Sequence, residues 1–221
     1  PRCVERLHGM FGLAIWDSRK RELFLARDRL GIKPLYYAEL PGGFLFGSEI
    51  KALLCDRRFR PVPHDGVVFD YLTQARQDHT TETFFRDIRQ LAPGEYLIVH
   101  GGQGGSRFER DRWWHVPEST HAVSRSEAVT RTRELIHDSI RLELRADVPV
   151  GSCLSGGLDS STIVCLMKTL VTASTVPQTF SCCHDDSRYD ERRYIQSVVA
   201  RTGVGNQAVF PDPTRLWDAL P

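Results

Sequence analysis

Short apolar runs separated by turn residues fill much of the first half of the chain. Runs rich in β-branched and aromatic residues that lie between turn signals predict strands. Such runs cover residues 11–17, 22–28, 34–40, 44–47 and 96–99. Pro41-Gly42-Gly43 separates the third run from the fourth and is a strong hairpin signal. Together the runs predict an antiparallel meander.

Two short helices are also expected in this half. Ser48 is placed to cap a helix that extends to Leu54, with Glu49 favourable in its first turn. Apolar residues at helical spacing predict a second helix over residues 64–75; they are Val67, Val68, Tyr71 and Leu72.

The hydrophobic period changes after about residue 120. Ser124 and Glu127 match a capping box and precede apolar residues at helical spacing up to about Ala146. Apolar strand candidates then alternate with helical stripes: strands at 149–154, 179–183 and 207–210, and helices at 160–171 and from about 194 to Gly203. This alternation predicts a parallel sheet with right-handed crossovers.

Composition and length fit two ordinary globular domains. The chain has 221 residues, of which 41% are hydrophobic and 26% are charged. Residues 116–123 have the composition of a linker, and we expect domains at 1–118 and 119–221.

Charge and cysteine usage narrow the class further. Lys+Arg is 29 and Asp+Glu is 28, so the net charge is +1, which does not favour a nucleic-acid partner. There is no secretory signal and no run of about 18 apolar residues, so a cytoplasmic protein without a membrane segment is expected. The six cysteines form no C-x-x-C motif, and we interpret them as reduced, mostly buried thiols.

One motif carries chemistry. It is the segment Leu154-Ser-Gly-Gly-Leu-Asp-Ser-Ser161, between a predicted strand and a predicted helix. Gly156 and Gly157 allow the backbone to approach an anion closely, and Ser155, Ser160 and Ser161 add hydroxyl groups. The start of the helix adds free N–H groups and the positive end of its dipole. These features suit a phosphate or pyrophosphate group.

Asp159 is unexpected in an anion site, because a carboxylate repels phosphate unless a cation lies between them. We therefore interpret Asp159 as a ligand of Mg²⁺, which is commonly held by one or two carboxylates plus substrate phosphates. The alternative is a glycine-rich turn in which Ser155 or Asp159 only caps the helix.

The same residues carry a family resemblance. Ser155–Ser160 matches the PP-loop of the N-type ATP pyrophosphatases. Gly9–Asp17 (GMFGLAIWD), Ala26–Tyr36 (ARDRLGIKPLY), Phe46–Leu53, Leu91–Tyr96 and Leu144–Gly151 resemble segments of glutamine-dependent asparagine synthetases, in the same order. The resemblance covers nearly the whole chain.

The resemblance implies an α+β part followed by an α/β part. These would be the C-terminal part of an Ntn-type glutaminase sandwich and the N-terminal part of a Rossmann-like PP-loop domain. It further implies a longer enzyme, of which these residues lack both ends, that uses ATP and Mg²⁺. That enzyme would convert aspartate to asparagine through a β-aspartyl-adenylate, with ammonia from glutamine. A homodimer is the expected full-length assembly.

Individual residues follow from the resemblance. Leu154, Ser155, Gly156, Gly157, Leu158, Asp159, Ser160 and Ser161 would bind the nucleotide. Cys182 falls where relatives have an adenine-contacting Val, although a simple core cysteine remains the alternative. The family's nucleophilic cysteine lies upstream, and Cys3 does not match it. No catalytic residue is therefore expected here, and the 221 residues alone are expected to be inactive.

The charged residues of the first half have a structural interpretation. Arg27, Asp28, Arg29 and Lys33 would belong to the glutaminase sheet or its interface, without a direct part in catalysis.

Two other functions remain open at this stage. β-Lactam synthetases and other amide-forming tailoring enzymes share the architecture and the adenylation chemistry. A catalytically incomplete ATP-binding or scaffold protein also fits these residues.

Overall fold

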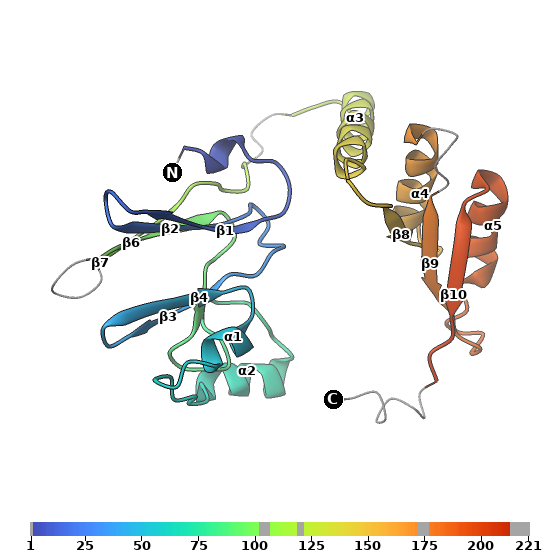
Figure 1. The fold of residues 1–221 in the computed structure, drawn as a ribbon. Helices are drawn as coiled ribbons and strands as arrows, with labels where there is room; N and C mark the ends of the chain where they lie inside the picture. The colour runs from blue at the N-terminus through green and yellow to red at the C-terminus, as the bar shows by residue number, and fades with distance from the viewer. Residues whose placement is uncertain (1, 102–106, 119–121, 172–176, 213–221) are drawn as a thin grey trace. The chain divides into compact units, whose positions relative to one another are not determined.

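The computed structural model describes residues 2–101, 107–118, 122–171 and 177–212. The chain divides into two compact units, Pro1–Ser119 and Thr120–Pro221, which we call unit 1 and unit 2. Each combines helices with strands, so the fold is mixed α and β (Figure 1). No helix of these described ranges is long and apolar enough to cross a membrane.

Unit 1 contains two antiparallel sheets. The first has the order β1-β2-β6-β7 and consists of β1 (Gly12–Asp17), β2 (Glu22–Arg27), β6 (Glu95–His100) and β7 (Arg107–Arg112). The second has the order β4-β3-β5 and consists of β3 (Tyr36–Leu40), β4 (Gly43–Gly47) and β5 (Arg89–Gln90). The β3–β4 hairpin is confirmed. The single meander is wrong, because β2 pairs with the distant β6 and not with β3.

Side chains of the two sheets form successive apolar layers. Leu25 and Leu97 belong to a buried cluster that contains residues of both sheets. Their strand neighbours Ala26 and Tyr96 point the opposite way, into another cluster with Val4 of the short 3₁₀ helix Val4–Arg6. This alternation is the period-2 pattern expected of strands. A third cluster joins β3 to α1 (Ile50–Leu54).

The turn that leaves β2 is organised by Asp28, which is 2% exposed. Its carboxylate accepts the backbone N–H groups of Leu30, Ile32, Lys33 and the distant Phe11 at 2.9–3.2 Å. Burial alone would raise the pKa of Asp28, but these N–H groups hold it below its usual range.

The neighbouring Arg27 side chain is also buried. It donates to the carbonyl groups of Gly31, Lys33 and Leu91 and to Gln90 Oε1. Arg27 and Asp28 thus have the structural role that was expected of them.

The helices of unit 1 differ from the sequence prediction in two details. Helix α1 has Glu49, not Ser48, at its N-cap, and the Glu49 side chain forms an ion pair with Lys51 at 2.6 Å. The predicted cap by Ser48 is therefore wrong. Helix α2 (Asp65–Gln74) is confirmed, and His64 caps it by accepting from the Val67 N–H. Its predicted apolar stripe is only partly covered: Val67 is buried, whereas Leu72 is 75% exposed.

Unit 2 has the predicted strand and helix alternation. Its elements are α3 (Arg125–Glu143), β8 (Gly151–Cys153), α4 (Leu158–Leu170), β9 (Gln178–Cys182), α5 (Arg192–Thr202) and β10 (Gly205–Val209). The strands are parallel in the order β10-β9-β8. Leu154, Val164 and Ile195 belong to the core that α4 and α5 share with the sheet.

The two predicted helix ends in unit 2 are also confirmed. Ser124 Oγ accepts the Glu127 N–H at the start of α3, and Gly203 ends α5 with a φ of 67°. The apolar stripe of α3 is not buried, however, since none of the helix residues is buried within the described ranges.

The prediction of mostly buried cysteines is wrong. All six thiols are free, but only Cys183 is buried, while Cys3, Cys55, Cys153 and Cys182 are exposed. For Cys182 the cause is the sheet face that it occupies. Phe180 lies two residues earlier on the same face of β9 and is itself 47% exposed.

We predict that Asp28→Asn lowers the free energy of unfolding by about 2–4 kcal/mol, because its amide group cannot accept all of these N–H donors. Since the folded-state pKa of Asp28 is lowered, its contribution is present above its unfolded pKa and is lost as pH falls through the folded value. Urea unfolding at several pH values measures both effects. The exposed Asp87→Asn is the control, and equal stability of the two variants would contradict the role of Asp28.

Candidate functional site

The candidate site is the loop between β8 and α4. Leu154 follows β8 and is fully buried, while Leu158 begins α4 and is exposed. The structure therefore brings Leu154–Ser161 together in one tight connection at the carboxyl end of a parallel strand. Ligands of open α/β sheets bind at this edge. We call Ser155–Ser161 the nucleotide loop, after the ligand that the sequence predicts for it.

The serine side chains close the loop on itself. Ser160 Oγ accepts the Ser155 N–H at 3.2 Å, donates to the Gly157 carbonyl at 3.3 Å and lies 3.1 Å from Ser155 Oγ. Ser155 Oγ in turn accepts the Gly157 N–H at 3.4 Å. The hydroxyl groups thus define the shape of the loop before any ligand is bound.

Gly156 is required by its backbone conformation and by its neighbours. Its φ is +86°, and a Cβ atom there would lie 3.0 Å from Tyr194 Cβ and 3.1 Å from the Glu191 carbonyl oxygen. Gly157 differs, because it has a φ of −68° and a Cβ atom added to it would meet only Ser155 Oγ, at 3.4 Å. The loop therefore packs against the start of α5 at Gly156.

The first turn of α4 supplies backbone donors. Ser161 N–H already bonds to the Gly157 carbonyl at 3.1 Å. The N–H groups of Leu158, Asp159 and Ser160 precede it and have no carbonyl partner within the helix, as at every helix start. Asp159 lies in this turn and is exposed. An anion at the helix start would therefore lie near one carboxylate.

Cys182 ends β9, the strand next to the loop. Phe180, two residues earlier, accepts the Leu154 N–H through its carbonyl at 2.8 Å. Cys182 is exposed, and its Sγ lies 3.9 Å from His184 Nε2. The thiol thus lies at the same sheet edge as the loop, and the alternative of a buried core cysteine does not hold for it.

Four residues near the loop were missed from the sequence. Glu191 and Tyr194 contact Gly156, and Ser181 and Asn206 form a hydrogen-bonded chain to the Leu154 carbonyl. The alternation of Thr179 and Ser181 with Phe180 and Cys182 favours an exposed hydroxyl face, which is the reverse of the burial in the structure. Glu191 and Tyr194 have no sequence signal either.

Charged side chains after β9 form local pairs. Arg188 bonds to Asp186 at 2.6 Å, and Arg192 bonds to Asp190 at 2.8 Å. The guanidinium groups of Arg188 and Arg192 hold the pKa of these two carboxyls below the usual range. Arg188 and Arg192 are therefore already engaged with carboxylates, whereas the Arg193 guanidinium lies over the ring of Tyr194.

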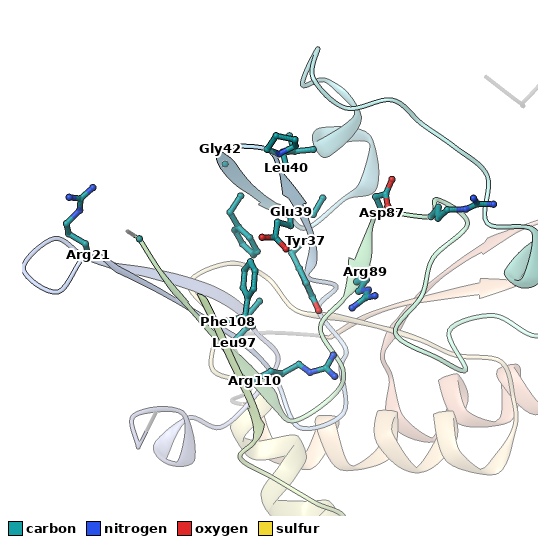
Figure 2. Close-up of a pocket in the computed structure, with 16 residues that line it drawn as sticks. Arg21, Tyr37, Glu39, Leu40, Gly42, Asp87, Arg89, Leu97, Phe108 and Arg110 are labelled. Atoms are coloured by element: carbon teal, nitrogen blue, oxygen red, sulfur yellow. The ribbon is translucent and has the colours of Figure 1, made fainter. Parts of the chain in front are cut away.

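A cavity of about 910 Å³ is a second candidate, but it lies in unit 1. Tyr37, Leu97 and Phe108 line its apolar part, and it includes no residue of the nucleotide loop. Figure 2 shows the labelled charged side chains spread across the view, with Arg21 at the left, Asp87 and Arg89 at the right, and Glu39 beside Tyr37 between them. Because these groups are dispersed, we place the candidate site at the loop.

Metal and nucleophile candidates are few. Across the described ranges, no three His, Cys, Asp or Glu side chains are arranged to hold a metal ion. A magnesium ion at Asp159 would therefore need further ligand oxygens, from phosphate groups or water. Cys3 is exposed and stands at the N-cap of the 3₁₀ helix Val4–Arg6.

Family comparisons match the two parts of the chain to two different families. Residues 1–114 match the glutamine amidotransferase domain family, and residues 131–221 match the asparagine synthase family. The class is thus an amidotransferase domain followed by a synthase domain. The chain belongs to the glutamine-dependent asparagine synthetase family.

Individual relatives are much longer than this chain. Asparagine synthetase [glutamine-hydrolyzing] 3 of Bacillus subtilis is 37% identical over 74% of the chain and 26% of its own length. Asparagine synthetase [glutamine-hydrolyzing] 1 of the same organism is 28% identical over 99% and 33%, respectively. Amidase chyE of Penicillium rubens is 30% identical over 96% and 33%. The chain thus spans about a quarter to a third of these relatives.

We predict that Gly156→Ala lowers the free energy of unfolding by about 1–3 kcal/mol, because a side chain there is both strained and in contact with α5. Gly157→Ala is the matched control and should stay within about 1 kcal/mol of the native chain. Thermal or urea unfolding measures both. Equal losses for the two glycines would contradict the packing of the loop against α5.

Proposed function

We propose that the nucleotide loop binds the phosphates of ATP. The observation that carries this proposal is a parallel strand that ends in a glycine-rich serine loop at the start of helix α4. Backbone N–H groups and the dipole at a helix start favour phosphate binding. Gly157 leaves space on its side of the loop, since only Ser155 Oγ would lie within 4 Å of an added Cβ.

Mg²⁺ fits the same arrangement. The exposed carboxylate of Asp159 would hold the ion together with phosphate oxygens, in keeping with the oxygen ligands that Mg²⁺ prefers. When bound, the ion would offset negative charge on the departing pyrophosphate. The chain's own residues have the remaining tasks: Ser155 and Ser160 orient the phosphates, and Gly156 keeps the loop against α5.

For the full-length protein we propose a glutamine-dependent, amide-forming ligase. In this reaction the aspartate carboxylate attacks the α-phosphorus of ATP, pyrophosphate leaves, and ammonia from glutamine displaces AMP to give asparagine. The names and lengths of the synthetase relatives support this proposal. Cys182, at the edge of the sheet beside the loop, would line the adenine pocket. Aspartate, glutamine and ATP are the proposed substrates, and a homodimer is the proposed assembly.

A second candidate is amide chemistry on another substrate. Two fungal relatives carry the name amidase, and they match 96% and 78% of this chain. The same loop would then activate a different carboxylate. Full-length protein incubated with aspartate, glutamine and ATP decides between the two: asparagine formation supports the first, and ATP consumption only with another carboxylate supports the second.

We predict that the 221-residue chain binds ATP in the presence of Mg²⁺. Titration with a fluorescent ATP analogue, followed by competition with unlabelled ATP and with inorganic pyrophosphate, measures the affinity. Pyrophosphate should compete, because the loop is proposed to hold that part of the nucleotide. Absence of any binding at millimolar ATP would contradict the proposed site.

We further predict that Asp159→Asn abolishes ATP–pyrophosphate exchange in the full-length enzyme. The amide removes the negative charge that is proposed to hold Mg²⁺, and loss of one transition-state interaction of this kind commonly costs about 10²–10³ in rate. Asp138→Asn, an exposed change on α3, is the control. Near-normal exchange by the Asp159 variant would contradict the role of this carboxylate.

A further inference from the structure

Three polar side chains form a hydrogen-bonded cluster next to Leu154, the residue before the nucleotide loop. Thr179 and Ser181 of β9 are 0% and 3% exposed. Asn206 of β10 donates from Nδ2 to Thr179 Oγ1 at 3.0 Å and to Ser181 Oγ at 2.8 Å. Buried polar groups are costly unless they are hydrogen-bonded, and in this cluster each hydroxyl has partners.

The two hydroxyl groups of the cluster reach different carbonyl groups. Thr179 Oγ1 donates to the Gly205 carbonyl at 2.8 Å, where β10 begins. Ser181 Oγ donates to the Leu154 carbonyl at 2.6 Å, where the nucleotide loop begins. Thr179 and Ser181 lie on the same strand and the same face, and both are buried. They differ chiefly in the carbonyl group to which each hydroxyl donates.

Leu154 is the last residue before the loop that is hydrogen-bonded to β9. The β8–β9 pairing ends at Cys153 and Phe180, and the Leu154 N–H still donates to the Phe180 carbonyl at 2.8 Å. The Ser181 hydroxyl then secures the Leu154 carbonyl from the same strand. Both backbone polar groups of Leu154 are thus fixed by β9, immediately before Ser155.

We propose that Ser181, oriented by Asn206, is a positioning residue that sets the nucleotide loop for phosphate binding. This inference rests on the proposed function of the loop. The loop offers backbone N–H groups and hydroxyls, whose hydrogen bonds weaken steeply outside about 2.7–3.2 Å. A small shift of the Leu154 carbonyl moves these donors together, so the buried hydroxyl controls affinity without touching the ligand.

Ser181→Ala and Thr179→Ala make a matched pair for the test. Each removes one hydroxyl from the same buried cluster, and each leaves one carbonyl and one Asn206 contact without that partner. Three properties are measured on the full-length protein: urea unfolding, the affinity for ATP with Mg²⁺, and hydrogen exchange of the amides of residues 155–161 without nucleotide.

Both variants are expected to lose stability, but only Ser181→Ala should change the loop. We expect its ATP affinity to fall about 5- to 10-fold, the equivalent of one hydrogen bond, and its loop amides to exchange faster. Thr179→Ala should stay within about twofold of the native affinity. Ser181→Cys, which keeps a weaker donor of similar size, should lie between the native chain and Ser181→Ala. It takes the place of Ser181→Ala if that variant does not fold.

Two results would overturn the inference: native-like affinity and exchange in the Ser181 variant, or equal losses of affinity in both alanine variants. Failure of the proposed function is distinguishable. If the native chain binds no ATP, that function is wrong, while the exchange contrast between the two variants still decides whether Ser181 positions the loop.

Discussion

The buried carboxylate of Asp28 is the constraint on which unit 1 depends. It joins the residue before β1 to the turn after β2, since it accepts N–H groups from Phe11 and from Leu30, Ile32 and Lys33. A carboxylate at this depth is tolerated only when several donors surround it. The chain therefore leaves β2 in one direction and enters β3 in a separate sheet, with Arg27 bracing the same turn from the other side.

In unit 2, neutral side chains fix the turn that follows a strand. Ser181 and Asn206 fix the turn after β8 through hydroxyl and amide hydrogen bonds, in the way that Asp28 fixes the turn after β2. The difference in charge has a consequence. A buried carboxylate beneath the nucleotide loop would repel a phosphate, whereas a hydroxyl holds the backbone without adding to the negative charge. Neutral support is thus suited to a loop that is proposed to receive an anion.

The sequence predicted local features well and long-range ones poorly. Most strand and helix positions, the β3–β4 hairpin and the strand–loop–helix connection were predictable, because apolar period and turn residues are local signals. The division into two sheets was not, since it depends on the long-range pairing of β2 with β6. Strand β7 was missed because its sequence, Arg-Phe-Glu-Arg-Asp-Arg, is charged; it is an edge strand with mostly exposed side chains. Within the candidate site, the motif identified Ser155–Ser161, but the contacts of Gly156 with α5 came only from the fold.

On the proposed function, affinity for a polyanion must come from geometry more than from side-chain charge. The only charged side chain within Ser155–Ser161 is Asp159, which is negative. The nearby Arg188 and Arg192 are paired with Asp186 and Asp190, and Arg193 lies over the ring of Tyr194. A helix start supplies the equivalent of only about half a positive charge. Mg²⁺ would then provide most of the opposing charge, and the loop would provide donors in fixed positions. Because side-chain charge cannot compensate for misplaced donors, packing at Gly156 and hydrogen bonding at Leu154 become requirements for binding as well as for folding.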